Sequence, residues 1–175
     1  MKPFSEKVMS IYSENHVIVM NDNKSNILVP FDATELSVKA LNKAKDLASN
    51  QSSTIIVLYI IDDTSFYPKE IAKFISNMDD LDKTRHYFEK TIREGAEMMI
   101  RKEVDRLTHE GVAAKSIIRV GHPADEILTV SKEENSSMIV MGSSGSLKKR
   151  HDRKGIGSIS RWISEVATCP VVLVR

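Results

Sequence analysis

The 175-residue sequence lacks the features that define several large protein classes. It has one cysteine, Cys169, which excludes an internal disulfide framework and a multi-cysteine metal site. Lysine and arginine number 25 against 24 aspartates and glutamates, and a formal net charge of +1 excludes a generally basic nucleic-acid binder and an acidic tail. We therefore expect a protein of a reducing compartment, the cytoplasm.

Long apolar runs are also lacking. The longest, within 54–61, is far shorter than the roughly 20 residues that a membrane span requires. Residues 1–20 have no apolar middle of the kind found in a signal peptide, because charged side chains such as Glu6 and Lys7 interrupt them. We expect no membrane partner. The composition, 41% hydrophobic and 28% charged, suits one packed domain.

Short β-branched segments alternate with helical patterns along the chain from Asn26 onward. Continuous apolar strands separated by helices indicate parallel pairing with both faces of the sheet covered. We predict an α/β fold: a single doubly wound, five-stranded parallel sheet with helices on both faces, Rossmann-like. The predicted strands are 27–30, 54–61, 116–120, 138–141 and 171–174, and the main helices are about 34–49, 81–110, 123–131 and 159–166.

Several boundaries and faces of these helices can be predicted individually. Asp32 or Thr34 is expected to cap the first helix, and Gly111 to end the long middle one. A helical segment with Ile71, Phe74, Ile75 and Met78 on one face is expected to end at a break at Asp79-Asp80, before the long middle helix. The stripe of that long helix that contains Phe88, Ile92 and Met99 is expected to lie in the core.

A glycine-rich loop follows the fourth predicted strand. Met141-Gly142-Ser143-Ser144-Gly145 leaves the strand, and Gly155-Ile156-Gly157-Ser158 leads into a helix. Glycine allows close approach of the backbone to an anion, and a helix start offers free amides and a positive dipole end. The spacing fits neither a P-loop, nor a dinucleotide fingerprint, nor a nucleophile elbow. The loop is therefore either a phosphate cradle or a plain connection.

Several segments in order carry a resemblance to a known family: Asn26-Ile27-Leu28-Val29-Pro30-Phe31-Asp32, Gly121-His122-Pro123-Ala124-Asp125-Glu126-Ile127-Leu128, Met138-Ile139-Val140-Met141-Gly142-Ser143-Ser144-Gly145, Gly157-Ser158-Ile159 and Cys169-Pro170-Val171-Val172-Leu173-Val174. Together they resemble the universal stress protein family over about 26–175. The resemblance implies a Rossmann-like domain, usually a homodimer, that in many members binds ATP or a related adenine nucleotide.

The resemblance also implies a set of nucleotide-binding residues. Gly142 and Gly145 match positions that line the triphosphate, and Gly157 with Ser158 match the helix start that holds it. Ile159 matches a position whose backbone takes part, Asp32 matches the residue at the adenosine end, and Ile60 matches the backbone position that reads adenine. Pro30 and Met141, which border these positions, complete the expected site.

The loop departs from the family spacing. Eleven residues separate Gly145 from Gly157, whereas the family pattern has nine. Taking Gly155 as the third glycine restores nine but places Ile156 where serine or threonine is expected. We favour Gly157-Ser158, because Ser158 leads directly into the helical stripe and is a good N-cap residue.

The same loop is basic, with Lys148, Lys149, Arg150, Arg153 and Lys154 against one acid, Asp152. It could neutralise a triphosphate, form a solvated surface loop, or contact an acidic partner. We do not expect nucleic acid as a partner, because no aromatic residues are interleaved for stacking on bases.

The sequence gives weaker support for a metal site or a catalytic site. No two of the five histidines have a zinc-ligand spacing, so we expect no metal site; His122 lies on the predicted ligand side. No activated nucleophile or catalytic triad is evident, so we expect no enzyme, or at most slow ATP hydrolysis or autophosphorylation at Ser143 or Ser144.

The sequence thus predicts an N-terminal extension over 1–25 and a universal stress protein-like domain over 26–175. The expected function is binding of ATP or another adenine nucleotide, with or without Mg²⁺, in stress response or signalling through nucleotide-dependent partner contacts. The alternatives are a nucleotide-free dimeric interaction protein and a weak ATPase or phosphotransferase. We expect a homodimer through Val171–Val174, because an exposed apolar edge strand tends to be paired.

Overall fold

The computed structural model describes residues 12–13, 16–17, 25–49, 53–62, 78–144 and 155–175. Its centre is a five-stranded sheet in the order β5-β4-β3-β6-β7, with every neighbouring pair parallel. This confirms the predicted doubly wound α/β sheet. The strands are β3 (Asn26–Pro30), β4 (Thr54–Ile61), β5 (Ala114–Val120), β6 (Ser136–Gly142) and β7 (Val171–Val174).

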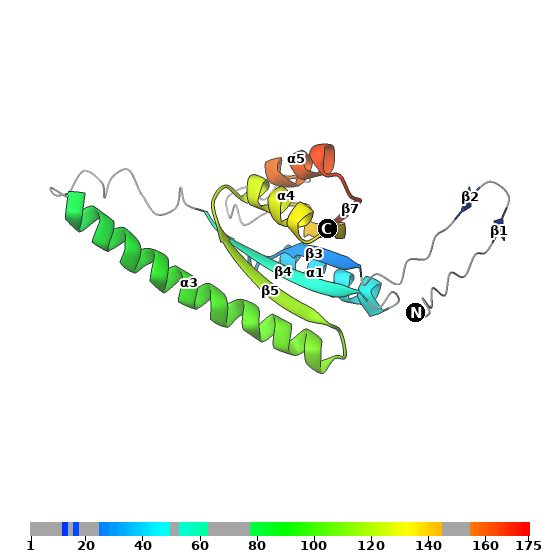
Figure 1. Ribbon diagram of the computed structural model, residues 1–175, viewed down its shortest axis with the longest axis horizontal. Helices are drawn as coiled ribbons and strands as arrows, with labels where there is room; N and C mark the ends of the chain where they lie inside the picture. The colour runs from blue at the N-terminus through cyan, green and yellow to red at the C-terminus, as the bar shows by residue number, and fades with distance from the viewer. Residues whose placement is uncertain (1–11, 14–15, 18–24, 50–52, 63–77, 145–154) are drawn as a thin grey trace, which may run out of the picture.

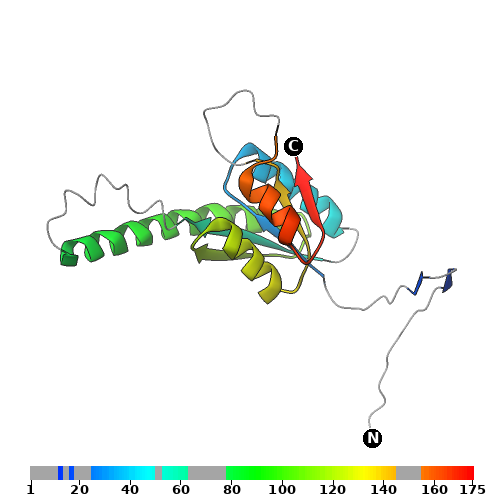
Figure 2. The same ribbon diagram turned by 90° about the horizontal axis from the view of Figure 1, so that it is seen from above.

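Four helices cover the two faces of the sheet (Figure 1, Figure 2). On one face, α1 (Glu35–Ser49) packs mainly on β3 and β6, and α3 (Met78–His109) packs on β4 and β5. The other face carries α4 (Pro123–Glu133) and α5 (Ser158–Val166). Successive strand residues point to opposite faces, so covering both faces explains why the strands are apolar throughout.

The core accordingly divides into two layers. Ile27, Val29 and Val57 are fully buried on the side of α1 and α3. Leu28 and Ile139 are fully buried on the side of α4 and α5. Both layers pack against the central strands β3, β4 and β6. This packing holds the carboxyl ends of the three strands in fixed relative positions.

The ends of α1 and α3 are formed as the sequence predicts. The Thr34 hydroxyl accepts a hydrogen bond from the amide of Ser37 at 3.3 Å, which makes Thr34 the N-cap of α1. Gly111 follows α3 with φ of +81°, and the Val112 amide donates to the Leu107 carbonyl at 2.9 Å. A left-handed residue with such a bond is the usual glycine C-cap, because glycine adopts positive φ without strain.

Two predictions about α3 are wrong. Asp79-Asp80 does not interrupt α3: the helix begins at Met78, and these acids lie in its first turn, where they complement the helix dipole. The helical segment predicted before them lies, apart from Met78, outside the described residues. The stripe with Ile92 and Met99 is not core: these side chains are 38% and 37% exposed, whereas Ala96 is buried. Phe88, the third member, has a side chain outside the described residues.

Within 1–25 the structure describes two short strands, β1 (Tyr12–Ser13) and β2 (His16–Val17), which pair antiparallel. The larger sheet begins at Asn26, the first residue of β3. In the part of the chain that the structure describes, no helix is both long enough and apolar enough to cross a membrane.

Candidate functional site

A cavity opens where the strand order reverses. Chain order runs outward from β3 to β4 and β5, then returns to β6 on the other side of β3. In open parallel sheets, ligands bind beyond the carboxyl ends of the strands at this reversal. Here the ends of β3, β4 and β6 and the starts of α1, α4 and α5 surround a cavity of about 150 Å³.

Six of the nine predicted site residues line this cavity: Pro30, Asp32, Ile60, Met141, Gly142 and Ile159. Gly157 and Ser158 directly precede Ile159 at the start of α5. Gly145 lies outside the described residues, as does the basic segment 148–154. Residues from four segments that are far apart in the sequence therefore meet at this cavity.

Asp32 is held in a fixed orientation at the side of the cavity. Its Oδ1 atom accepts hydrogen bonds from the Thr34 hydroxyl at 2.6 Å and from the Thr34 amide at 3.1 Å. These bonds form the tight turn between β3 and α1. Oδ1 is thus used within the protein, and Oδ2 of the exposed carboxylate is available to a hydroxyl donor.

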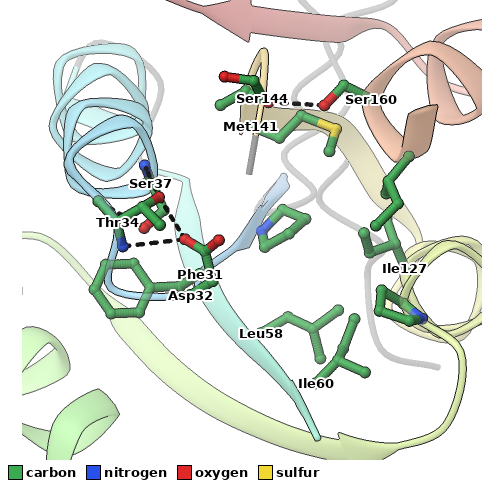
Figure 3. A pocket seen from close by; sticks show the side chains of 14 residues that line it. Phe31, Asp32, Thr34, Ser37, Leu58, Ile60, Ile127, Met141, Ser144 and Ser160 are labelled. Atoms are coloured by element: carbon green, nitrogen blue, oxygen red, sulfur yellow. Dashed lines mark hydrogen bonds between the residues drawn. The ribbon is translucent and has the colours of Figure 1, made fainter. Parts of the chain in front are cut away.

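The cavity has an apolar end and a hydroxyl-bearing end (Figure 3). Leu58 and Ile60 of β4 form the apolar end, with Ile127 of α4 beside them. Ser144 and Ser160 lie at the opposite end, and Asp32 lies between the two. An elongated ligand with a flat apolar group, hydroxyls and an anionic tail would find matching surfaces in that order.

Gly142 ends β6 directly against the first turn of α1. A Cβ atom at this position would lie 2.9 Å from the Cβ of Leu36 and 3.3 Å from its carbonyl carbon. The glycine is therefore required by the close approach of helix and strand, independently of any ligand. The same absence of a side chain leaves the backbone of residue 142 open to the cavity.

The start of α5 differs from the prediction in one respect. Gly157, not Ser158, is the N-cap, with extended backbone angles φ −65° and ψ 161°, and no side chain caps the helix. Ser158 is the first helical residue, because the first intrahelical bond runs from the Arg161 amide to the Gly157 carbonyl at 2.9 Å. The amides of the first turn have no partner within the helix, which favours an anion there.

Sequence reasoning did not assign Ser37 and Ser160 to the site. Both side chains are buried, each 4% exposed, and both line the cavity. A signal existed for Ser160: it lies three residues before Ile163, on the inward face of an amphipathic helix, where an apolar residue is expected. Pro123 and Ile127, which are not among the predicted site residues, line the cavity too.

His122 does lie on the ligand side, as predicted, next to the lining residue Pro123. Its side chain is 58% exposed, and its Nδ1 atom is 3.5 Å from an Asp125 carboxylate oxygen. Among the described residues, no three His, Cys, Asp or Glu side chains are grouped as a metal site would require.

The sheet order and the position of the cavity define a doubly wound α/β protein with a cavity at its switch point, where proteins of this class bind ligands. A model of the universal stress protein family matches residues 24–175. The chain is 31% identical over 158 residues to the universal stress protein YxiE of Bacillus subtilis, covering 86% of this chain and 99% of the relative. It belongs to the universal stress protein family.

Solved structures share the fold. Universal stress protein UspA from Lactobacillus plantarum superposes with a TM-score of 0.71 at 22% identity, covering 89% of this chain and all of that one. Two further structures have TM-scores of 0.56: a universal stress protein in complex with cAMP, 17% identical, and one from Archaeoglobus fulgidus in complex with dAMP, 16% identical. They cover 86% and 87% of this chain and 97% and 98% of their own.

Proposed function

We propose that this protein binds an adenine nucleotide, with ATP as the first candidate, in the cavity at the carboxyl ends of β3 and β6. The observation that carries the proposal is the order of surfaces in that cavity: apolar at Leu58 and Ile60, a carboxylate at Asp32, then Gly142 and the start of α5. These surfaces suit a base, a ribose and a phosphate chain respectively.

Family membership and relatives of the same fold support this proposal. Structures of two such relatives are complexes with cAMP and with dAMP, both adenine nucleotides. ATP carries the same adenosine end with a longer phosphate chain. Mg²⁺, if it accompanies ATP, would be held chiefly by the phosphates, since the described residues show no cluster of metal ligands.

Calorimetry tests the proposal, with a matched pair of variants. ATP should release heat and raise the unfolding temperature, because a ligand at 100 times its Kd stabilises the native state by about 2.7 kcal/mol. Asp32→Asn should weaken binding several-fold. Asp46→Asn, at an exposed position on α1, is the control and should bind as the wild type does.

A result without heat or thermal shift at millimolar ATP, AMP and cAMP would refute the proposal. Mass spectrometry of small molecules released on denaturing the purified protein gives an independent answer. A nucleotide-free result in both experiments would favour the alternative, a dimeric interaction protein of the same fold.

In our proposal the bound nucleotide changes contacts with partner proteins during stress response or signalling in the cytoplasm. A homodimer through β7 is part of this proposal, because β7 is an edge strand of the sheet and all four of its residues are only half-buried. We propose binding without turnover. Labelled ATP with Mg²⁺ should therefore yield no product beyond trace hydrolysis.

A further inference from the structure

The hydroxyl of Ser160 is buried at the phosphate end of the proposed nucleotide site. Ser160 lies in the first turn of α5 and lines the cavity, with 4% of the residue exposed. Its Oγ donates to the carbonyl oxygen of Gly142 at 2.9 Å, as the dashed line in Figure 3 marks. The bond thus joins the start of a helix to the end of a strand 18 residues earlier.

One backbone hydrogen bond reinforces the same junction, and a second fixes the end of β6 against β7. The Gly157 amide donates to the Ser143 carbonyl at 2.7 Å, and the Ser143 amide donates to the Val174 carbonyl at 2.8 Å. Of these three bonds, the Ser160 bond alone comes from a side chain. It can therefore be removed by substitution while the other two donors and acceptors remain.

The partial negative charge of the Gly142 carbonyl oxygen lies at the proposed phosphate end of the cavity. A carbonyl oxygen carries partial negative charge and repels a phosphate, whereas the first-turn amides of α5 attract one. The Ser160 hydroxyl occupies a lone pair of this oxygen and holds it toward the helix. Without that donor, a carbonyl at the cavity wall is left unpaired and the end of β6 is free to shift relative to α5.

We propose that Ser160 is a positioning residue of this site: through the Gly142 carbonyl it sets the end of β6 against the first turn of α5, so that phosphates meet amide donors. The inference rests on the proposed nucleotide function and deepens it. It concerns the phosphate end alone, because Asp32, Leu58 and Ile60 lie on other elements.

The test compares ATP with adenosine, measured by calorimetry on the full chain. Ser160→Ala should weaken ATP binding about tenfold while the Kd of adenosine changes less than twofold. Ser164→Ala is the matched control, since Ser164 is exposed on the same helix and its hydroxyl donates to the Ser160 carbonyl at 2.7 Å. It should change neither affinity.

A second pair separates the hydroxyl from the shape of the side chain. Threonine and valine have nearly the same volume, so Ser160→Thr should keep the wild-type ratio of ATP to adenosine affinity and Ser160→Val should lose it. This pair decides the question if Ser160→Ala fails to fold. Equal losses for ATP and adenosine in the hydroxyl-free variants, or unchanged ATP binding, would overturn the inference.

Failure of the proposed function has a different signature. If the wild-type protein binds neither ATP nor adenosine, the nucleotide proposal itself fails. If the wild type binds both and the hydroxyl-free variants bind ATP equally well, only the role of Ser160 is refuted.

Discussion

Gly142 has a packing role and a proposed ligand-binding role, and a substitution would affect both together. It lies in the family's glycine pattern, and it also lets α1 pack directly on β6 through Leu36. Loss of ligand binding in a Gly142 variant would therefore not by itself identify a ligand contact. Ser160 offers a cleaner probe of the same place, because its substitution removes one hydrogen bond and adds no atoms.

We predict that Gly142→Ala destabilises the fold in the absence of any ligand. The added Cβ would lie 2.9 Å from the Leu36 Cβ, and backbone as well as side chain must move to relieve this contact. Overpacking of this kind lowers the free energy of unfolding by about 1–3 kcal/mol. Urea unfolding monitored by circular dichroism measures it.

Gly155→Ala is the control for this prediction, because a Cβ at that position would have open space around it. The urea concentration at the midpoint of unfolding of Gly155→Ala should equal that of the wild type within experimental error. Equal stability of the Gly142 and Gly155 variants would show that α1 can move away from β6 at little cost.

At the level of elements, the sequence predicted a five-stranded, parallel, doubly wound sheet because five apolar strands alternate with helices and right-handed crossovers place those helices on both faces. It also placed Asp32 and Gly142 at strand ends, where the site lies. It could not place Ser37 or Ser160, because their positions depend on how α1 and α5 pack against the sheet.

The exposure of the N-terminal part of α3, which includes Ile92, has a simple geometric reason. The helix has 32 residues and β5 has seven, so at their usual rises per residue they are about 48 Å and about 23 Å long. The helix must therefore extend past the sheet, as Figure 1 shows. Helical periodicity does not show how much sheet lies opposite Ile92, which is on the overhanging side of the buried Ala96. Met99 lies between the buried residues Ala96 and Ile100, so its exposure follows from its direction around the helix axis and not from the overhang.

An ion pair between Lys45 and Glu110 joins α1 to the end of α3 and predicts a pH effect. Lys45 contacts the Glu110 carboxylate at 2.8 Å, and Arg106 contacts it at 3.3 Å. The hydrogen bond from Lys45 lowers the pKa of Glu110 below its ordinary value. A carboxylate with a lowered pKa stabilises the fold above its ordinary pKa, about 4.3, and this contribution is lost as the pH falls through the folded-state pKa.

Glu110→Gln should therefore be slightly less stable than the wild type at pH 6, and the difference should shrink as the pH approaches 3. Thermal unfolding across this range measures it. Glu97→Gln, at an exposed position within α3, serves as the control. A difference that stays constant with pH would mean that the charge of Glu110 does not contribute.

At the scale of the whole molecule, the two edges of the sheet differ. Edge strand β5 carries Lys115 and Arg119, which form ion pairs with Glu134 and Glu133. Edge strand β7 is Val171-Val172-Leu173-Val174, without a charged side chain. Charges on an edge discourage pairing with another sheet, and an uncharged apolar edge permits it.

We accordingly predict a dimer at micromolar concentration by light scattering. Leu173→Lys should shift the protein toward monomer, because it places a charge in the edge strand that we expect to pair. Ile118→Lys, in the opposite edge strand, is the control and should leave the dimer intact. A wild-type monomer, or a dimer that survives Leu173→Lys and dissociates in Ile118→Lys, would contradict the use of β7.

The hydrogen bond between Gly157 and Ser143 also bears on how this family can vary in evolution. It closes the segment 144–156 at its base, so residues inserted there need not displace β6 or α5. Lengthening a closed loop from 11 to 13 residues adds only about 0.15 kcal/mol of closure entropy, because the term grows with the logarithm of length. A two-residue insertion at this position is therefore expected to be nearly neutral for folding.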